Sequence, residues 1–200
     1  MTDRRVIEAT NALLHITEPN IFHFIQCGLF NDAVGLLQNN MKILEDEDIE
    51  GDTPLFYAVI YNNIELFRYF LENGANVYHF NKNGFHILHY CIKYRLIDFC
   101  IMLFMRGFNV NLQSRCGNSA LHLACLYGDC RLVHLLLKHE NINMYIRNYD
   151  GILPIKYAIV NNYTLIIAIF LYSKYDSDFI IDKSNNSLYS YMMNCKSCDN

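Results

Sequence analysis

Apolar residues recur along this chain in paired short stretches, and a polar loop follows each pair. Both stretches suit short helices with one apolar face, and the second ends in a doublet such as Phe70-Leu71 or Leu136-Leu137. The inward position of the first stretch is taken in turn by Leu55, Leu88, Leu121 and Ile155. No single pair can bury its apolar faces alone, so each must pack on its neighbours. The pattern predicts an all-α chain of stacked helix-turn-helix units.

Glycines mark the length of the repeating unit. They are Gly51, Gly84, Gly117 and Gly151, which lie 33, 33 and 34 residues apart. Each opens a similar phrase, as in Gly51-Asp-Thr-Pro-Leu-Phe-Tyr-Ala58 and Gly117-Asn-Ser-Ala-Leu-His-Leu-Ala124. Self-similarity at this period is typical of a helical solenoid. Because such stacks usually present a binding surface, the pattern favours a binding protein over an enzyme.

The repeated phrase resembles the ankyrin repeat, whose family pattern is Asp-x-x-Gly-x-Thr-Pro-Leu-His-x-Ala, then a second helix and Gly-Ala-Asp/Asn-Val-Asn. The best match carries Thr53-Pro54-Leu55 and Gly74-Ala75-Asn76-Val77. The resemblance implies an all-α ankyrin-repeat solenoid with short β-hairpin loops. We expect an N-terminal helical extension over 1–19, a capping repeat over 20–47, repeats over 48–80, 81–113, 114–147 and 148–181, and a truncated C-terminal repeat over 182–200.

Composition narrows the class of protein further. Of 200 residues, 52% are hydrophobic, and no Pro/Gly/Ser-rich linker divides the repeats, so we expect one domain. A net charge of −4 argues against nucleic-acid binding, which needs a basic surface. The longest apolar run, Leu165 to Tyr172, is shorter than the ~20 residues of a membrane span, and no secretory signal is visible. We expect a cytoplasmic and nuclear protein that binds neither nucleic acid nor membrane.

Cysteines and histidines have structural interpretations. Among the eight cysteines, Cys91 shares its repeat position with Ala58, Ala124 and Ala158, so it is expected to fill the core as a reduced thiol. The repeat's Leu-His position holds His89 and His122, which are expected to hydrogen-bond neighbouring repeats together. No phosphate loop, nucleophile–base pair or metal-ligand set is visible. We expect no catalytic site, no metal and no cofactor.

Tyrosines give the leading candidate for a partner-binding surface. Ankyrin-like first helices and hairpin tips form the concave face, and stacked tyrosines there would suit a protein partner. The first-helix candidates are Tyr57, Tyr61, Tyr90, Tyr94, Tyr127 and Tyr157, and those at the tips are Phe80, Arg115, Arg147 and Tyr149. The alternative is that an AT-rich genome enriches tyrosine everywhere, since the chain has 15.

Acidic residues gather in the loop that leads into the repeat at 48–80. They are Glu45, Asp46, Glu47, Asp48 and Glu50. Clustered charge speeds and orients the encounter with an oppositely charged partner, so the cluster is a candidate docking patch for a basic segment. The alternative is a solvated loop without a partner.

The bias towards Asn, Ile, Tyr and Lys resembles ankyrin proteins of large DNA viruses, such as poxviruses and insect viruses. This resemblance implies a non-enzymatic interaction module that binds and inhibits a host regulatory protein. Its sharpest version is inhibition of an NF-κB/Rel factor by mimicry of the I-κB inhibitors. The alternatives are a substrate adaptor for a host ubiquitin ligase and a truncated relic of a longer ankyrin protein. We expect a monomer or a weak homodimer.

Overall fold

The computed structural model describes residues 20–173 and residue 187. The expected helical extension over 1–19, and all of the expected repeat over 182–200 except Ser187, lie outside the described residues. The first helices of successive pairs are α2 (Ile21–Gln26), α4 (Pro54–Ile60), α6 (Ile87–Lys93), α8 (Ala120–Leu126) and α10 (Pro154–Val160). The second helices are α3 (Phe30–Asn39), α5 (Ile64–Glu72), α7 (Ile97–Met105), α9 (Cys130–Leu137) and α11 (Thr164–Tyr172), and a 3₁₀ turn, η1 (Met41–Glu45), follows α3.

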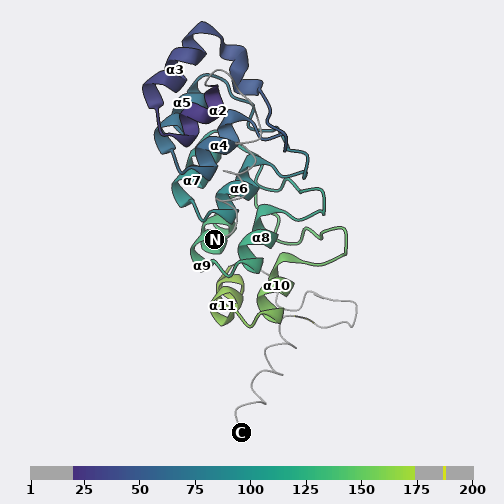
Figure 1. The fold of residues 1–200 in the computed structure, drawn as a ribbon. Coiled ribbons are helices and arrows are strands. Elements are labelled where there is room, and N and C mark those ends of the chain that lie inside the picture. The colour runs from purple at the N-terminus through teal and green to yellow at the C-terminus, as the bar shows by residue number, and fades with distance from the viewer. Residues whose placement is uncertain (1–19, 174–186, 188–200) are drawn as a thin grey trace.

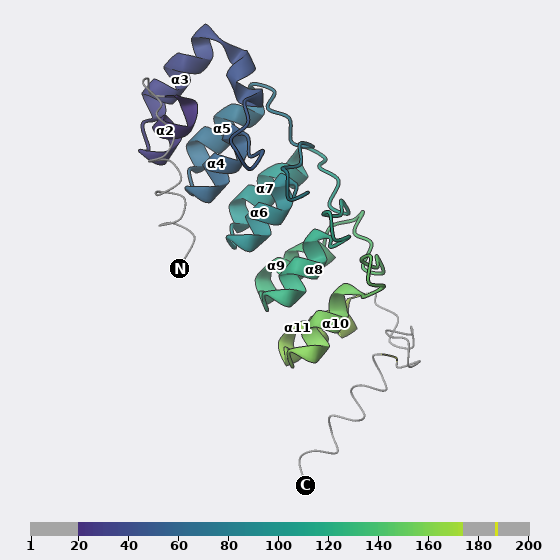
Figure 2. The same ribbon diagram turned by 45° about the vertical axis from the view of Figure 1, so that its right-hand side comes forward.

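These helix pairs stack in chain order. Each first helix packs against the first helix of the next pair, from α2 to α10, and the loops between pairs project to one side of the stack (Figures 1 and 2). One pair falls within each of the ranges 20–47, 48–80, 81–113, 114–147 and 148–181. The predicted all-α solenoid is therefore confirmed.

The core is continuous from pair to pair. Ala58, Cys91, Ala124 and Ala158 are fully buried, so the small-residue column is confirmed as core. Large rings fill the space between second helices, where Phe67 of α5 packs against Phe99 of α7 with ring centroids 4.8 Å apart. Because these contacts join different repeats, part of the hydrophobic stabilisation of each unit comes from its neighbours.

Two histidines connect adjacent repeats, as predicted. The Nδ1 atom of His89 accepts from the backbone N–H of His86 at 3.2 Å, so its Nε2–H donates to the carbonyl of Asn118 at 2.9 Å. His122 repeats the arrangement with Ser119 and with the carbonyl of Ile152 at 3.0 Å. Burial lowers the pKa of His89 to about 4, which keeps the ring neutral and its tautomer fixed at pH 7.

Successive loop tips also touch. The backbone N–H of Arg115 donates to the carbonyl of Gly84 at 3.2 Å, and that of Tyr149 to Cys116 at 3.3 Å. Gly84 and Gly117 have φ values of +72° and +78°. A Cβ on Gly84 would lie 2.5 Å from the Arg115 Cβ, and one on Gly117 would lie 2.6 Å from the Tyr149 nitrogen. Both positions need glycine for its backbone conformation and for the close approach of the next loop.

We predict that Gly84→Ala and Gly117→Ala destabilise the stack more than Gly107→Ala does. Gly107 is the control, because its φ is +71° and no atom lies within 4 Å of the Cβ it would gain, although both neighbouring repeats are described. All three variants bear the left-handed backbone cost of about 1–2 kcal/mol. In Gly84→Ala and Gly117→Ala the new methyl group also displaces the next loop, which adds about 1–3 kcal/mol to the loss of stability. Urea unfolding measures the difference, and equal losses in all three variants would contradict the close-approach explanation.

Candidate protein-interaction surface

The first-helix tyrosines occupy two different positions. Tyr61, Tyr94 and Tyr127 cap the C-terminal ends of α4, α6 and α8. Tyr57, Tyr90 and Tyr157 lie one helical turn earlier. The side chains of Tyr57 and Tyr90 are only 6% and 9% exposed, and Tyr157 is half-buried. The two sets of tyrosines therefore differ in how much surface they can offer to a partner.

Tyr57, Tyr90 and Tyr157 hold the loops between repeats in place. The Tyr57 hydroxyl donates to Asp48 Oδ2 at 2.9 Å, and Asn81 Nδ2 donates to the Tyr90 hydroxyl oxygen at 2.9 Å. Asn148 Nδ2 is 3.2 Å from the Tyr157 hydroxyl oxygen, so each acidic or amide side chain meets the tyrosine nine residues later. The same side chains organise their loops, since the Oδ1 of each accepts two backbone N–H groups. Each tyrosine thus fixes its loop to its own helix.

The repeat over 114–147 lacks both partners of this pair. Ser114 stands where the other repeats have Asp or Asn, and Leu123, nine residues later, stands where they have Tyr. The buried Ser114 Oγ has no hydrogen-bond partner, in keeping with the absence of a hydroxyl at position 123. This joint change was the sequence signal that the column is structural. Tyr57 and Tyr90, predicted as part of a partner-binding stripe, leave little surface for a partner because both are buried in these contacts.

The helix-end tyrosines remain partly accessible. Tyr61 stacks on Tyr57 with centroids 6.0 Å apart, and Tyr94 lies 6.1 Å from Tyr90. Both are half-buried, whereas Tyr127 is exposed over 37% of its surface. These three rings can contribute edges to a contact, and Tyr57 and Tyr90 support Tyr61 and Tyr94 from beneath.

The predicted tip residues are exposed. Phe80 is 63% and Tyr149 75% exposed, and both arginine side chains are exposed. Arg115 Nη1 donates to the carbonyl of Lys82 at 3.2 Å, and Arg147 Nη1 to that of Gly151 at 2.7 Å. The guanidinium groups therefore lie along the loops. We refer to Phe80, Arg115, Arg147 and Tyr149 as the tip row.

Four of the five predicted acidic residues face solvent. Glu45, Asp46, Glu47 and Glu50 are exposed and form what we call the acidic corner. Asp48 differs, because its side chain is half-buried and holds Tyr57 and two loop amides. The acidic corner adjoins the next loop, where Asn83 Nδ2 donates to Glu50 Oε2 at 3.2 Å. It is thus continuous with the row of loop tips.

Asp52 follows the acidic cluster in sequence, and its burial was not predicted from sequence. Asp52 accepts from Asn81 Nδ2 at 2.7 Å and from the Tyr90 hydroxyl at 3.1 Å, which links two repeats. Burial, together with the charges of Asp48 and Glu50, raises the pKa of Asp52 to about 6, despite these two hydrogen bonds. A carboxylate of this kind in a cleft would suggest acid–base chemistry, but both of its oxygens are occupied within the fold. Its role is structural.

Neither a metal centre nor a membrane span is found in the described part. Among residues 20–173, no three His, Cys, Asp or Glu side chains are placed to bind one metal ion. None of the described helices combines the length and apolar character needed to cross a bilayer.

An extended stack of helix pairs with exposed loops and helix ends defines a solenoid interaction module. The family model described as ankyrin repeats (3 copies) matches residues 21–114 and 100–181. The chain belongs to the ankyrin repeat family, whose repeats form a protein-interaction fold.

Named relatives include viral and cellular proteins. The ankyrin repeat protein OPG189 of Variola virus is 27% identical over 168 residues, which cover 74% of this chain and 30% of the relative. Putative ankyrin repeat protein L371 of Acanthamoeba polyphaga mimivirus is 27% identical over 122 residues (61% and 16%). The nuclear factor NF-kappa-B p105 subunit of Gallus gallus is 30% identical over 134 residues (63% and 13%). The chain therefore spans less than a third of each relative.

We predict that Asp52→Asn stabilises the protein above pH 6. Between pH 4 and 6 the folded wild-type chain keeps a proton that the unfolded chain releases, so wild-type stability falls as the pH rises through this window. Asparagine has no proton to lose and still accepts from Asn81. The advantage of the variant should grow from pH 4 to 6 and reach up to about 3 kcal/mol.

Urea unfolding of both proteins at pH 4 and pH 7.5 measures this difference. The buried histidines titrate equally in both proteins, so their contribution cancels in the comparison. A difference in stability that does not change with pH would contradict the raised pKa of Asp52.

Proposed function

We propose that this chain is a non-enzymatic viral interaction module that binds and inhibits a host regulatory protein in the cytoplasm or nucleus. The specific candidate is a Rel-family factor. The observation that carries the proposal is the separation of charge along the loops. The acidic corner stands at one end of the loop series, and the exposed Arg115 and Arg147 follow two and three repeats further on (Figure 1). Lys82, one repeat on, belongs to the corner rather than to the basic tips, because its Nζ donates to the carbonyl of Ile49 at 2.7 Å.

Charge separation of this kind orients a partner. A basic segment, such as a nuclear-localisation segment, is attracted to the acidic corner and repelled from the tip row, which selects one direction of binding. Phe80 and Tyr149 add exposed aromatic area between and beyond the charged tips, and aromatic side chains are enriched in interface hot spots. The loops are held by internal hydrogen bonds before binding, so little conformational entropy is lost when a partner docks.

The relatives support the choice of partner class. Two of the reported relatives are viral ankyrin repeat proteins, and the third carries NF-kappa-B in its name. Their similarity is to the repeats, so the loop residues of this chain are what the proposal depends on. A viral mimic of I-κB would use the same kind of surface against a Rel factor.

We predict that Asp46→Lys combined with Glu47→Lys weakens binding to a Rel-family factor about tenfold or more, since like charges then oppose the basic segment. Both side chains are exposed, so the stack should stay folded. The matched control is Glu65→Lys with Asp98→Lys, which reverses two exposed acidic charges on α5 and α7, away from the loops. Titration calorimetry at two salt concentrations measures the affinity and its screening.

The control variant should bind as the wild type does. Equal losses in both variants would point to a non-specific charge effect and contradict the acidic corner as a docking patch. No binding of the wild-type chain to any Rel-family factor would refute the specific partner. Capture of cullin-ligase components instead would favour the adaptor alternative.

A further inference from the structure

The outward faces of the second helices change in character along the stack. Three positions spaced i, i+3 and i+7 lie on the outer face of each second helix. They are Glu65, Arg68 and Glu72 on α5; Asp98, Ile101 and Met105 on α7; Arg131, His134 and Lys138 on and just after α9; and Leu165, Ala168 and Tyr172 on α11. All except Ala168 are exposed, and Ala168 is half-buried.

Two neighbouring rows stand out. The α9 row holds only basic side chains, whereas the equivalent rows of α5 and α7 contain carboxylates. The α11 row is apolar, with Leu165 61% exposed and Tyr172 94% exposed. A solvated helix face normally carries polar residues, and the α7 row keeps Asp98 beside its exposed Ile101 and Met105. Leu165 stands exposed where the other repeats have Glu, Asp or Arg, so the α11 row is a candidate docking surface.

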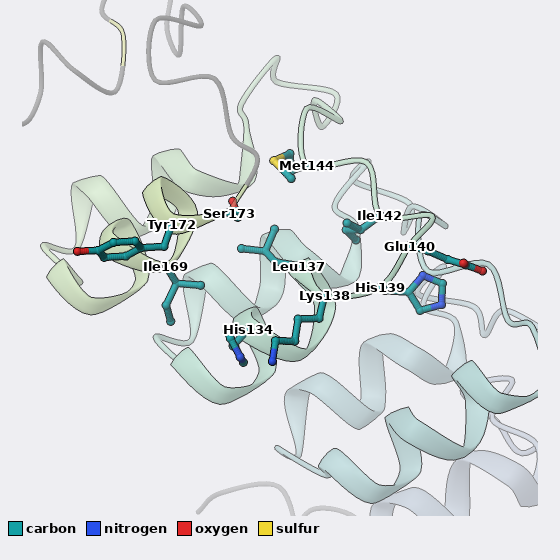
Figure 3. A pocket seen from close by; sticks show the side chains of 10 residues that line it. All are labelled: His134, Leu137, Lys138, His139, Glu140, Ile142, Met144, Ile169, Tyr172 and Ser173. Carbon is teal, nitrogen blue, oxygen red and sulfur yellow. The ribbon is translucent and has the colours of Figure 1, made fainter.

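A groove lies between these two rows. Its volume is about 570 Å³. His134 and Lys138 line one side and Ile169 and Tyr172 the other, and Leu137 forms part of the floor (Figure 3). Glu140 also lines the groove, at the end away from Tyr172 (Figure 3).

The sequence explains why a groove exists here. One repeat earlier, Phe104 of α7 packs against His139 with ring centroids 5.0 Å apart, and this pair fills the corresponding space. The equivalent residues one repeat later are Leu137 and Ser173, which are both smaller. The space that two rings occupy between one pair of repeats is therefore left open between the next.

We propose that this groove binds an amphipathic helix of a protein partner, with an apolar face and acidic edges. An apolar side chain of that helix would enter the groove against Ile169 and Leu137, and its carboxylates would lie over Arg131 and Lys138. The basic row supplies the charge complementarity, and the recess favours an inserted side chain over a flat bilayer surface. The site lies on the second-helix side of the stack and is separate from the loops of the proposed function.

The test uses a fluorescein-labelled helical peptide with leucines along one face and glutamates along its edges. Fluorescence anisotropy with the intact chain should show saturable binding that weakens with salt. A matched peptide with lysine in place of each glutamate should bind at least about tenfold more weakly. A photo-crosslinker at the central leucine should label residues of α9 and α11.

Matched variants locate the contact. Arg131→Glu with Lys138→Glu should weaken binding of the acidic peptide about tenfold or more, and Leu165→Glu should also weaken it. Glu65→Lys with Glu72→Lys, at the equivalent positions of α5, should leave binding unchanged. Asp46→Lys with Glu47→Lys should also leave it unchanged, so failure of this proposal and of the proposed function can be told apart.

Several results would overturn the proposal. Equal binding of the acidic and basic peptides, or crosslinks confined to the loops, would remove its basis. Concentration-dependent dimers that Leu165→Glu abolishes would assign the surface to a second copy of the chain. Binding to phosphatidylserine vesicles without binding to the peptide, lost on charge reversal of α9, would assign it to a membrane.

Discussion

The contact between adjacent repeats is the constraint on which the rest of this structure depends. A pair of six- to ten-residue helices has too little apolar surface to fold alone, so each pair is stable only when its neighbour covers it. Two kinds of contact hold adjacent repeats at a fixed distance. Neutral histidines donate across the repeat boundary, and glycines at the loop tips let the next backbone approach closely. The histidine bridges and the loop-tip glycines both recur at the repeat period, which helps to keep that period regular.

The need to hold adjacent repeats together uses some polar side chains in buried contacts and leaves others exposed. Asp48, Asp52 and Tyr57 have the chemistry of a binding or catalytic site, yet their polar atoms are used to hold loops and adjacent repeats together. The residues left for a partner are those with exposed side chains, at the loop tips, the acidic corner and the outer helix faces. Because the scaffold is fixed by buried contacts, these exposed positions can change charge and size at little cost to stability. This separation allows one fold to serve many partners.

Local variation between repeats creates the distinctive features of the molecule. Ser114 and Leu123 together replace a hydrogen-bonded pair that the repeats over 48–80, 81–113 and 148–181 keep. Leu137 and Ser173 replace a ring pair and open a groove. On α9 and α11 the outward positions become uniformly basic and then apolar. Each change is compatible with the stack because it affects one boundary only, so differences accumulate where the period itself is preserved.

The period, the helix pairs, the buried small-residue column and the bridging role of His89 could be predicted from sequence, because each repeats at a fixed spacing and its neighbour is the next copy of the same unit. The exposure of Tyr57 and Tyr90, the burial of Asp52 and the groove beside α11 could not. They depend on which atoms of one repeat meet those of the next across about 33 residues of chain. Spacing alone therefore determined the architecture of this protein, whereas side-chain packing between repeats, which exists only in the tertiary structure, decided which residues remain available to a partner.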